Sequence, residues 1–198
     1  MKKRVLSIIN DILFYAIIVG CIIFFISSPL NFYPPFILLL VFFSLIVIKK
    51  VFKLSEFEFL LLLINFYLGF LGENFMFGLY FKYQWYDKVL HFISWALIAT
   101  VVYFRLSKIM PKKYKTERHL ITFFSVLGLE ALWEIIEYIV DNLFLGPASK
   151  NLMQGVYING VMVMNSFSDT MYDIIFTALG ILFALVVFFV YEESKKVK

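Results

Sequence analysis

Long apolar runs follow one another along this chain and leave little sequence between them. A helix needs about 20 mostly apolar residues to cross a bilayer, so runs of this length predict transmembrane helices. Six such runs are present, although the second is short. The predicted helices span approximately 5–27, 32–48, 58–80, 84–104, 119–141 and 168–191.

The composition agrees with a chain that lies almost entirely in a membrane. The 198 residues are 62% hydrophobic and 16% charged, whereas soluble domains are about 25% charged. The aromatic residues spread over the whole length, so we expect no separate soluble domain. We therefore predict an all-α membrane protein in which residues 1–198 form one domain, a six-transmembrane-helix bundle.

Basic residues are concentrated in alternate loops between these runs. Fifteen of the 18 Lys and Arg residues fall on one predicted side of the membrane, and only Lys82, Lys88 and Lys150 fall on the other. The positive-inside rule then places both termini in the cytoplasm. The net charge of +4 arises from these loops, and we expect no nucleic-acid partner.

Ionisable residues interrupt the last three apolar runs, where lipid normally excludes them. An ionised side chain at the centre of a bilayer costs at least about 2.5–3.5 kcal/mol, so such residues usually face the interior of a bundle. Each pair has a spacing of three or four residues, which places both members on one helix face. The pairs are Asp87 with His91, Glu134 with Glu137, and Asp169 with Asp173, with Glu130 one turn behind the glutamates.

These residues predict a cation site in the outer half of the membrane. Five carboxylates and one imidazole require either protonation or a neutralising cation. Every Arg maps to the cytoplasmic side, and Lys88 alone supplies too little charge. We expect a divalent metal ion (Mg²⁺, Mn²⁺, Ca²⁺ or Zn²⁺) because its ligands are mostly carboxylate oxygens. The predicted ligands are Asp87, His91, Glu134, Glu137, Asp169 and Asp173, and the candidate catalytic residues are Glu130 and His91.

Four of these residues also have a simpler interpretation when they are taken alone, whereas Asp173 and the Glu134/Glu137 pair do not. Asp87 and Asp169 fit N-terminal helix caps, for which Asp is favoured. His91 fits a hydrogen-bonded core histidine, and Glu130 fits an isolated protonated acid. The metal hypothesis depends on the three pairs occurring together.

A second feature is the segment 156–163, which lies between the fifth and sixth predicted helices. It has two β-branched-rich runs around Asn159-Gly160, the strongest short signal for a β-hairpin. We predict a short external hairpin that leads into Asp169. It would act either as a lid over the acidic site or as a simple connection.

Several of these motifs resemble those of a known family over about 84–185. Tyr86-Asp87-Lys88 with His91-Phe92, Glu134-x-x-Glu137-Tyr138, and Asp169-Thr170 with Asp173 are similar to the YjdF-like family of bacterial inner-membrane proteins. A more distant similarity is to the VanZ family, which favours Gln at 137 and Asn at 177. The resemblance implies a bacterial cytoplasmic membrane location and the same polar residues, but no reaction.

Two function classes follow from the sequence. The first is a metal-dependent membrane enzyme, a hydrolase or transferase, acting on a lipid or lipid-linked small molecule of the cell envelope. The second is a cation- or proton-coupled transporter or channel, although polar residues are scarce in the inner halves of these helices. A structural or accessory subunit would leave the acids unexplained, and the oligomeric state is open.

Overall fold

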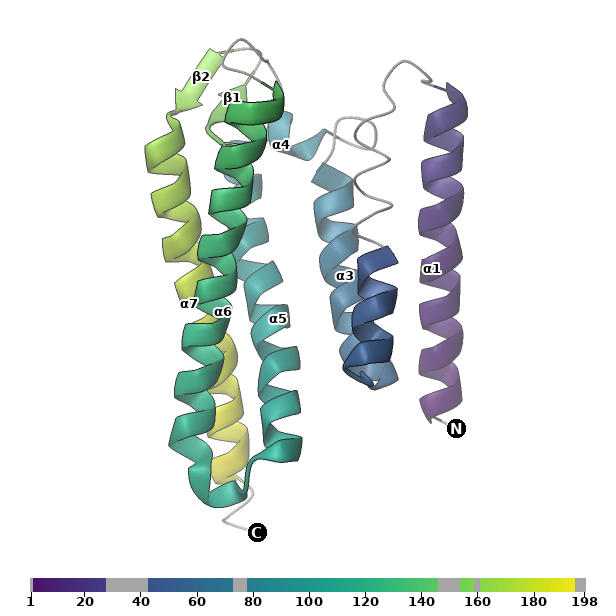
Figure 1. Cartoon of the computed structure of the whole chain (residues 1–198), viewed down its shortest axis with the longest axis vertical. Coiled ribbons are helices and arrows are strands. Elements are labelled where there is room, and N and C mark those ends of the chain that lie inside the picture. The colour runs from purple at the N-terminus through teal and green to yellow at the C-terminus, as the bar shows by residue number, and fades with distance from the viewer. Residues whose placement is uncertain (1, 28–42, 73–77, 146–153, 159–160, 195–198) are drawn as a thin grey trace. The chain divides into compact units, whose positions relative to one another are not determined.

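Figure 1 shows a computed structural model of the chain, which describes residues 2–27, 43–72, 78–145, 154–158 and 161–194. The residues form two compact units, Met1–Leu71 and Gly72–Lys198, and each unit is described by itself. Among the described residues, three helices are long and apolar enough to cross a membrane, and all three lie in the second unit. The six-span bundle and the single domain stay predictions.

The first unit contains α1 (Lys2–Ser27), a helix over 43–51, and α3 (Glu56–Gly72). Ser55 and Glu58 begin α3 with reciprocal hydrogen bonds between side chain and backbone, the arrangement called a capping box. The Asn10 amide donates to Glu56, and the Tyr67 hydroxyl donates to the Leu13 carbonyl at 2.8 Å. These polar contacts tie α1 to α3.

One predicted span differs from the structure, and another, 32–48, lies mostly outside the described residues and stays a prediction. The prediction of one helix over 58–80 is wrong, because α3 ends at Gly72 and a separate short helix, α4 (Leu79–Lys82), follows. Gly78, directly before α4, has φ 59° and ψ 38°, a left-handed conformation that a continuous helix does not contain.

The second unit is built on three long helices that agree with the last three predicted spans. Pro111 separates the first two of them, because the residue before a proline favours extended backbone. The Asn165 side chain accepts a hydrogen bond from the Ser168 amide at 2.9 Å and so caps the N-terminus of the third long helix. The elements are α5 (Tyr86–Ile109), the 3₁₀ turn η1 (Lys112–Tyr114), α6 (Lys115–Ile139), the π-helix η2 (Val140–Leu145) and α7 (Ser166–Ser194).

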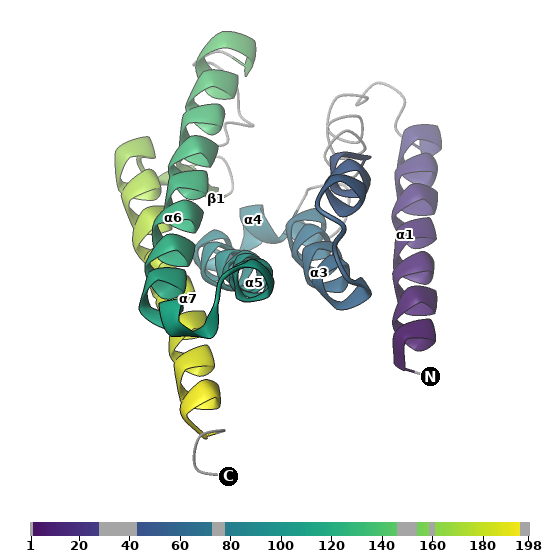
Figure 2. The same cartoon turned by 60° about the horizontal axis from the view of Figure 1, so that its bottom comes forward.

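The three helices pack side by side, with α5 and α7 in the most extensive contact (Figures 1 and 2). Gly180 makes this approach possible, because a side chain there would collide with the backbone carbonyl of Phe92 on α5. An apolar core fills the middle of the unit. Its buried residues are Ala99, Tyr103, Val126, Ile181, Ala184 and Leu185.

The predicted hairpin strands are present. β1 (Val156–Ile158) pairs antiparallel with β2 (Val161–Met164), and the register shifts between Val156 and Tyr157. The turn residues Asn159 and Gly160 lie outside the described residues. Both strands lie at the end of the bundle where α6 ends and α7 begins (Figure 1). Their position outside the membrane stays a prediction.

Candidate functional site

Ionisable side chains from all three long helices gather at the hairpin end of the second unit. All of them are buried except Asp87, whose side chain is 24% exposed. We call this group the acidic centre. It consists of Asp87, Lys88 and His91 on α5, Glu130, Glu134 and Glu137 on α6, and Asp169 and Asp173 on α7.

Lys88 has contacts in the acidic centre that the sequence does not indicate. The sequence indicates only that one lysine supplies too little charge to neutralise the acids. In the structure its side chain is 0% exposed, and its ammonium binds three aspartates. The ammonium lies 2.9 Å from Asp87, 2.6 Å from Asp173, and in a short contact with Asp169. The signal in the sequence was its position three residues before His91, which places both on one face of α5.

His91 links the three helices through its two ring nitrogens. Nδ1 lies 2.8 Å from Oε1 of Glu130 on α6. The hydroxyl of Thr177 on α7 donates to the same Glu130 oxygen at 2.9 Å. Nε2 lies on the other side of the ring, 3.6 Å from Oδ1 of Asp87 and 3.7 Å from Oδ1 of Asp173. Thr177 was noted in the sequence only as a departure from the VanZ pattern.

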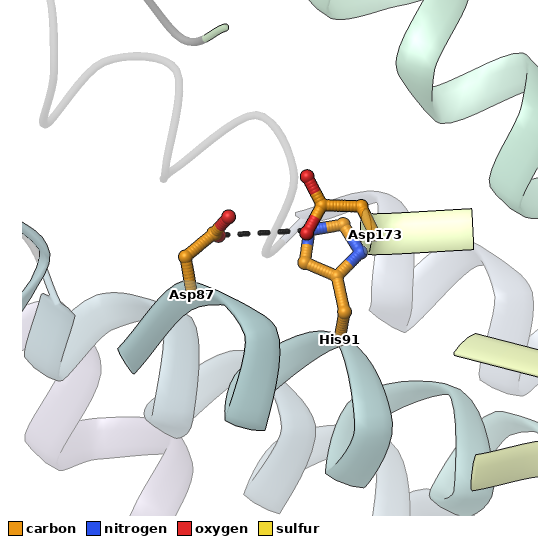
Figure 3. Close-up of side chains that lie close together, drawn as sticks. All are labelled: Asp87, His91 and Asp173. Atoms are coloured by element: carbon orange, nitrogen blue, oxygen red, sulfur yellow. Dashed lines mark ion pairs between the residues drawn. The ribbon is translucent and has the colours of Figure 1, made fainter. Parts of the chain in front are cut away.

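The arrangement of Asp87, His91 and Asp173 has the geometry of a ligand set. Figure 3 shows Asp87 and His91 projecting from α5 toward Asp173. Separations of 3.6–3.7 Å are too long for hydrogen bonds. They suit two atoms that each lie about 2.1 Å from a common ion. The same three residues offer ligand atoms that all lie within 4.8 Å of one another.

A second grouping of potential ligands involves His91, Glu130 and Glu134, also within 4.8 Å. Among the described residues, neither carboxylate oxygen of Glu134 has a hydrogen-bond partner, nor does Oε2 of Glu130. These atoms are buried, and a buried acceptor without a donor is costly. Of the predicted ligands, Glu137 and Asp169 belong to neither grouping, although both are buried nearby.

The residues directly before β1 form hydrogen bonds with and near the acidic centre. The Gly155 amide donates to Oδ2 of Asp169 at 2.6 Å. The Gln154 amide donates to Asp141 at 2.8 Å, and its side chain reaches the Glu134 carbonyl and the Thr170 hydroxyl. Asp141 is a weaker candidate from the sequence, and Gln154 is not predicted as a site residue. The start of the hairpin thus contacts both α6 and α7 at the acidic centre.

Long apolar helices that surround a buried charged centre define a helical integral membrane protein. A family model described as "Predicted membrane protein (DUF2238)" matches residues 9–194. The chain belongs to this family, which is the YjdF-like family that its motifs resemble. No curated protein and no solved structure matches the chain. The similarity to VanZ stays a resemblance of motifs.

Proposed function

We propose that the acidic centre holds one divalent cation and that the protein is a metal-dependent membrane enzyme. The observation that carries this proposal is the position of His91 between Glu130 and two aspartates. Histidines that bind metal commonly donate their second ring N–H to a carboxylate, which fixes the tautomer and the ring orientation. Glu130 is placed to accept from Nδ1–H, so that the Nε2 lone pair faces Asp87 and Asp173.

The charges around Lys88 support a divalent ion. Asp87, Asp169 and Asp173 carry three negative charges when ionised, and Lys88 carries one positive charge. The remaining two negative charges equal the charge of one divalent cation. Buried charges are stable only when they are paired, so a divalent cation would balance the three aspartates and Lys88, and the three glutamates are not part of this count.

The ligand set favours a hard or borderline cation. Carboxylate oxygens are the ligands of Mg²⁺, Mn²⁺ and Ca²⁺, and a single imidazole is also compatible with Mn²⁺ or Zn²⁺. Such an ion, when bound, lowers the pKa of a bound water or polarises a phosphoryl oxygen. Hydrolysis or group transfer at a phosphorylated substrate is the chemistry that this supports.

Two glutamates of α6 would orient His91 and accept a proton in this reaction. Glu130 orients His91 through Oε1, and Thr177 fixes Glu130 in turn. Oε2 of Glu130 and both oxygens of Glu134 have no hydrogen-bond partner among the described residues. An ionised carboxylate oxygen that accepts no hydrogen bond can accept a proton from water or from a substrate hydroxyl. We therefore assign the role of general base to this pair and a ligand role to His91.

The depth of the acidic centre supports a lipid or lipid-linked substrate. Asp87 and Asp169 lie in the first turns of α5 and α7, so the centre lies near one end of helices that can span a membrane. A lipid head group occupies this depth. We place this end on the outer side of a bacterial cytoplasmic membrane, with both termini inside, because of the basic loops.

Transport is the second candidate, and the apolar core argues against it within this unit. A path for a proton or cation needs polar groups along its length. Below Thr177 most buried residues are apolar, such as Val126, Ile181 and Leu185, although Thr122 and Tyr103 are buried there too. Their hydroxyl groups donate to the Arg118 carbonyl and to Glu192, away from the acidic centre.

The proposal is tested by thermal unfolding of the purified protein in detergent with and without divalent cations. A ligand that binds only the folded state raises the melting temperature. At a ligand concentration of 100 times the Kd, it raises the free energy of unfolding by about 2.7 kcal/mol. Mn²⁺ should raise it for the wild type and not for Asp173→Asn or His91→Ala. Glu192→Gln, at the opposite end of α7, should keep the rise. A wild-type melting temperature unmoved by Mg²⁺, Mn²⁺, Ca²⁺, Zn²⁺ or chelator would overturn the proposal.

A further inference from the structure

The ammonium group of Lys88 is surrounded in a way that is unusual for a lysine in an ion pair. Five oxygens lie within hydrogen-bonding range of Nζ, and they come from Asp87, Asp169 and Asp173. Asp173 binds through both of its carboxylate oxygens, at 2.6 and 2.7 Å. An ammonium has only three hydrogens to donate. The five oxygens therefore outnumber the hydrogens that the lysine can donate. In this respect they resemble the coordination shell of a metal ion.

Two of these aspartates also face the proposed metal site. Asp87 directs Oδ2 to Lys88 and Oδ1 to Nε2 of His91. Oδ1 of Asp173 lies 2.6 Å from Lys88 and 3.7 Å from Nε2 of His91. Both carboxylates thus lie between two positions for positive charge. Carboxylates in this position are typical of centres with two metal ions about 3.5–4 Å apart.

We propose that the ammonium of Lys88 fills the second cation position of a two-cation centre. This inference deepens the proposed function, since it concerns the number of ions at the same site. Lys88 supplies one positive charge that does not depend on the supply of metal, and it holds the bridging aspartates toward His91. The site is thereby restricted to one exchangeable divalent ion. Without the lysine side chain, Asp87, Asp169 and Asp173 form a second divalent site.

The burial of Lys88 supports this assignment over that of a simple ion pair. A lysine normally keeps its charge in water while its stem lies along apolar surface. Lys88 does the opposite, because its whole side chain is 0% exposed and its ammonium is at the centre of the aspartates. Its backbone is on α5, whereas two of its partners are on α7. The lysine thus links helices as a bound cation would.

The test is the amount of Mn²⁺ retained by the full-length protein after dialysis, measured by elemental analysis. The wild type should retain about one ion per chain and Lys88→Ala about two, a twofold rise, because a two-metal centre then forms. Two neighbouring Mn²⁺ ions should also give an exchange-coupled electron paramagnetic resonance spectrum. Lys88→Arg keeps the charge and should retain no more than the wild type. Lys115→Ala removes a lysine from an ion pair at the other end and should not change the amount.

The outcomes separate this inference from the proposed function. Equal retention by Lys88→Ala and the wild type overturns the inference, whether or not the wild type binds an ion. An ion bound by Lys88→Ala and none by the wild type supports the inference and overturns the proposed function. If Lys88→Ala unfolds in chelator, Mn²⁺ should restore its folding, and failure to do so also overturns the inference.

Discussion

The two ends of the three-helix unit both contain charged side chains, but they use them differently. At the hairpin end, the acidic centre holds six carboxylates against one lysine and one histidine. At the other end, Lys115 and Arg118 of α6 meet Glu192 and Glu193 of α7, two charges of each sign. We call this second group the balanced cluster. One end requires an added cation or protons, and the other does not.

Burial also differs between the two ends, although Arg118 of the balanced cluster is buried. Lys88 is 0% exposed, whereas the side chains of Lys115 and Glu193 are 20% and 40% exposed. The acidic centre has three buried carboxylate oxygens without partners among the described residues. In the balanced cluster, Glu192 accepts from the Tyr103 hydroxyl at 2.5 Å and also pairs with Lys115 and Arg118. Among the described residues of the balanced cluster, Nε of the buried Arg118 also lacks a partner, so the unpaired carboxylate oxygens are what distinguish the acidic centre, and such carboxylates are typical of a functional site.

The largest expected difference concerns the two lysines. Lys88→Met in chelator should lower the free energy of unfolding by about 3–5 kcal/mol, because it leaves buried aspartates without their cation. Lys115→Met should lower it by no more than about 1 kcal/mol, because its ion pairs are solvent-screened. Unfolding in detergent with increasing SDS measures both. Equal losses for the two variants would remove the contrast between the ends.

Two helix glycines give the next largest difference. Gly180→Ala should lower the free energy of unfolding by about 1–3 kcal/mol, because its new methyl group would push α7 away from the Phe92 carbonyl. Gly128→Ala has no heavy atom within 4 Å of the new methyl group and should stabilise by about 0.5–1 kcal/mol.

If the α5–α7 contact positions the acidic centre, Gly180→Ala should also weaken the stabilisation by Mn²⁺, and Gly128→Ala should not. The same SDS titration, repeated with Mn²⁺, measures this. A Gly180→Ala variant with wild-type stability and metal response would show that the close contact is not needed.

The same substitution at the two ends should have opposite signs. Glu192→Gln should lower the free energy of unfolding by about 1–2 kcal/mol, because a partly exposed carboxylate loses its charge-assisted partners. Glu134→Gln removes a buried charge that has no hydrogen-bond partner among the described residues, so stability should stay equal or rise. Equilibrium unfolding measures the free energy of unfolding of both variants. A loss for Glu134→Gln as large as that for Glu192→Gln would mean that a cation or a hydrogen-bond donor stabilises the Glu134 carboxylate in the folded protein.

The sequence predicts the last three helices well, because their length depends on local pattern, whereas the roles of the candidate site residues stay predictions. Apolar length defines α5, α6 and α7, and spacings of three and four residues place the acids on single helix faces. The break between α3 and α4 was missed because hydropathy does not register the backbone of Gly78. A run of apolar residues looks continuous even where one residue is left-handed.

The role of Lys88 could not be predicted because it depends on contacts between helices. Its partners Asp169 and Asp173 are more than 80 positions away, and the approach of α5 to α7 at Gly180 brings them together. A count of loop charges places Lys88 beside the acids but does not show which of them it binds. Spacing also grouped Glu137 with Glu134, although only Glu134 lies with His91 and Glu130. Local pattern thus identifies the members of the acidic centre, and packing decides which of them meet.

The smallest expected effect concerns the hairpin, which lies at the end of the acidic centre. The Gln154 side chain donates to the Glu134 carbonyl at 3.3 Å and to the Thr170 hydroxyl at 3.2 Å. Gln154→Ala should therefore lower the free energy of unfolding by about 0.5–1.5 kcal/mol. Asn142→Ala is the matched control, because its amide donates to the Tyr138 carbonyl at an exposed position and its loss should have almost no effect.

Hydrogen exchange distinguishes a lid from a simple connection. The Gly155 amide donates to Asp169, which also binds Lys88. If the hairpin is a lid, the exchange rate of this amide should therefore change when the acidic centre is stabilised. In Gln154→Ala the Gly155 amide should exchange faster, and Mn²⁺ should slow that exchange by strengthening the aspartate cluster. Exchange at amides beside the balanced cluster should not respond to Mn²⁺. If Gly155 exchanges at the same rate with and without Mn²⁺, the hairpin is a connection that contacts the acidic centre without closing it.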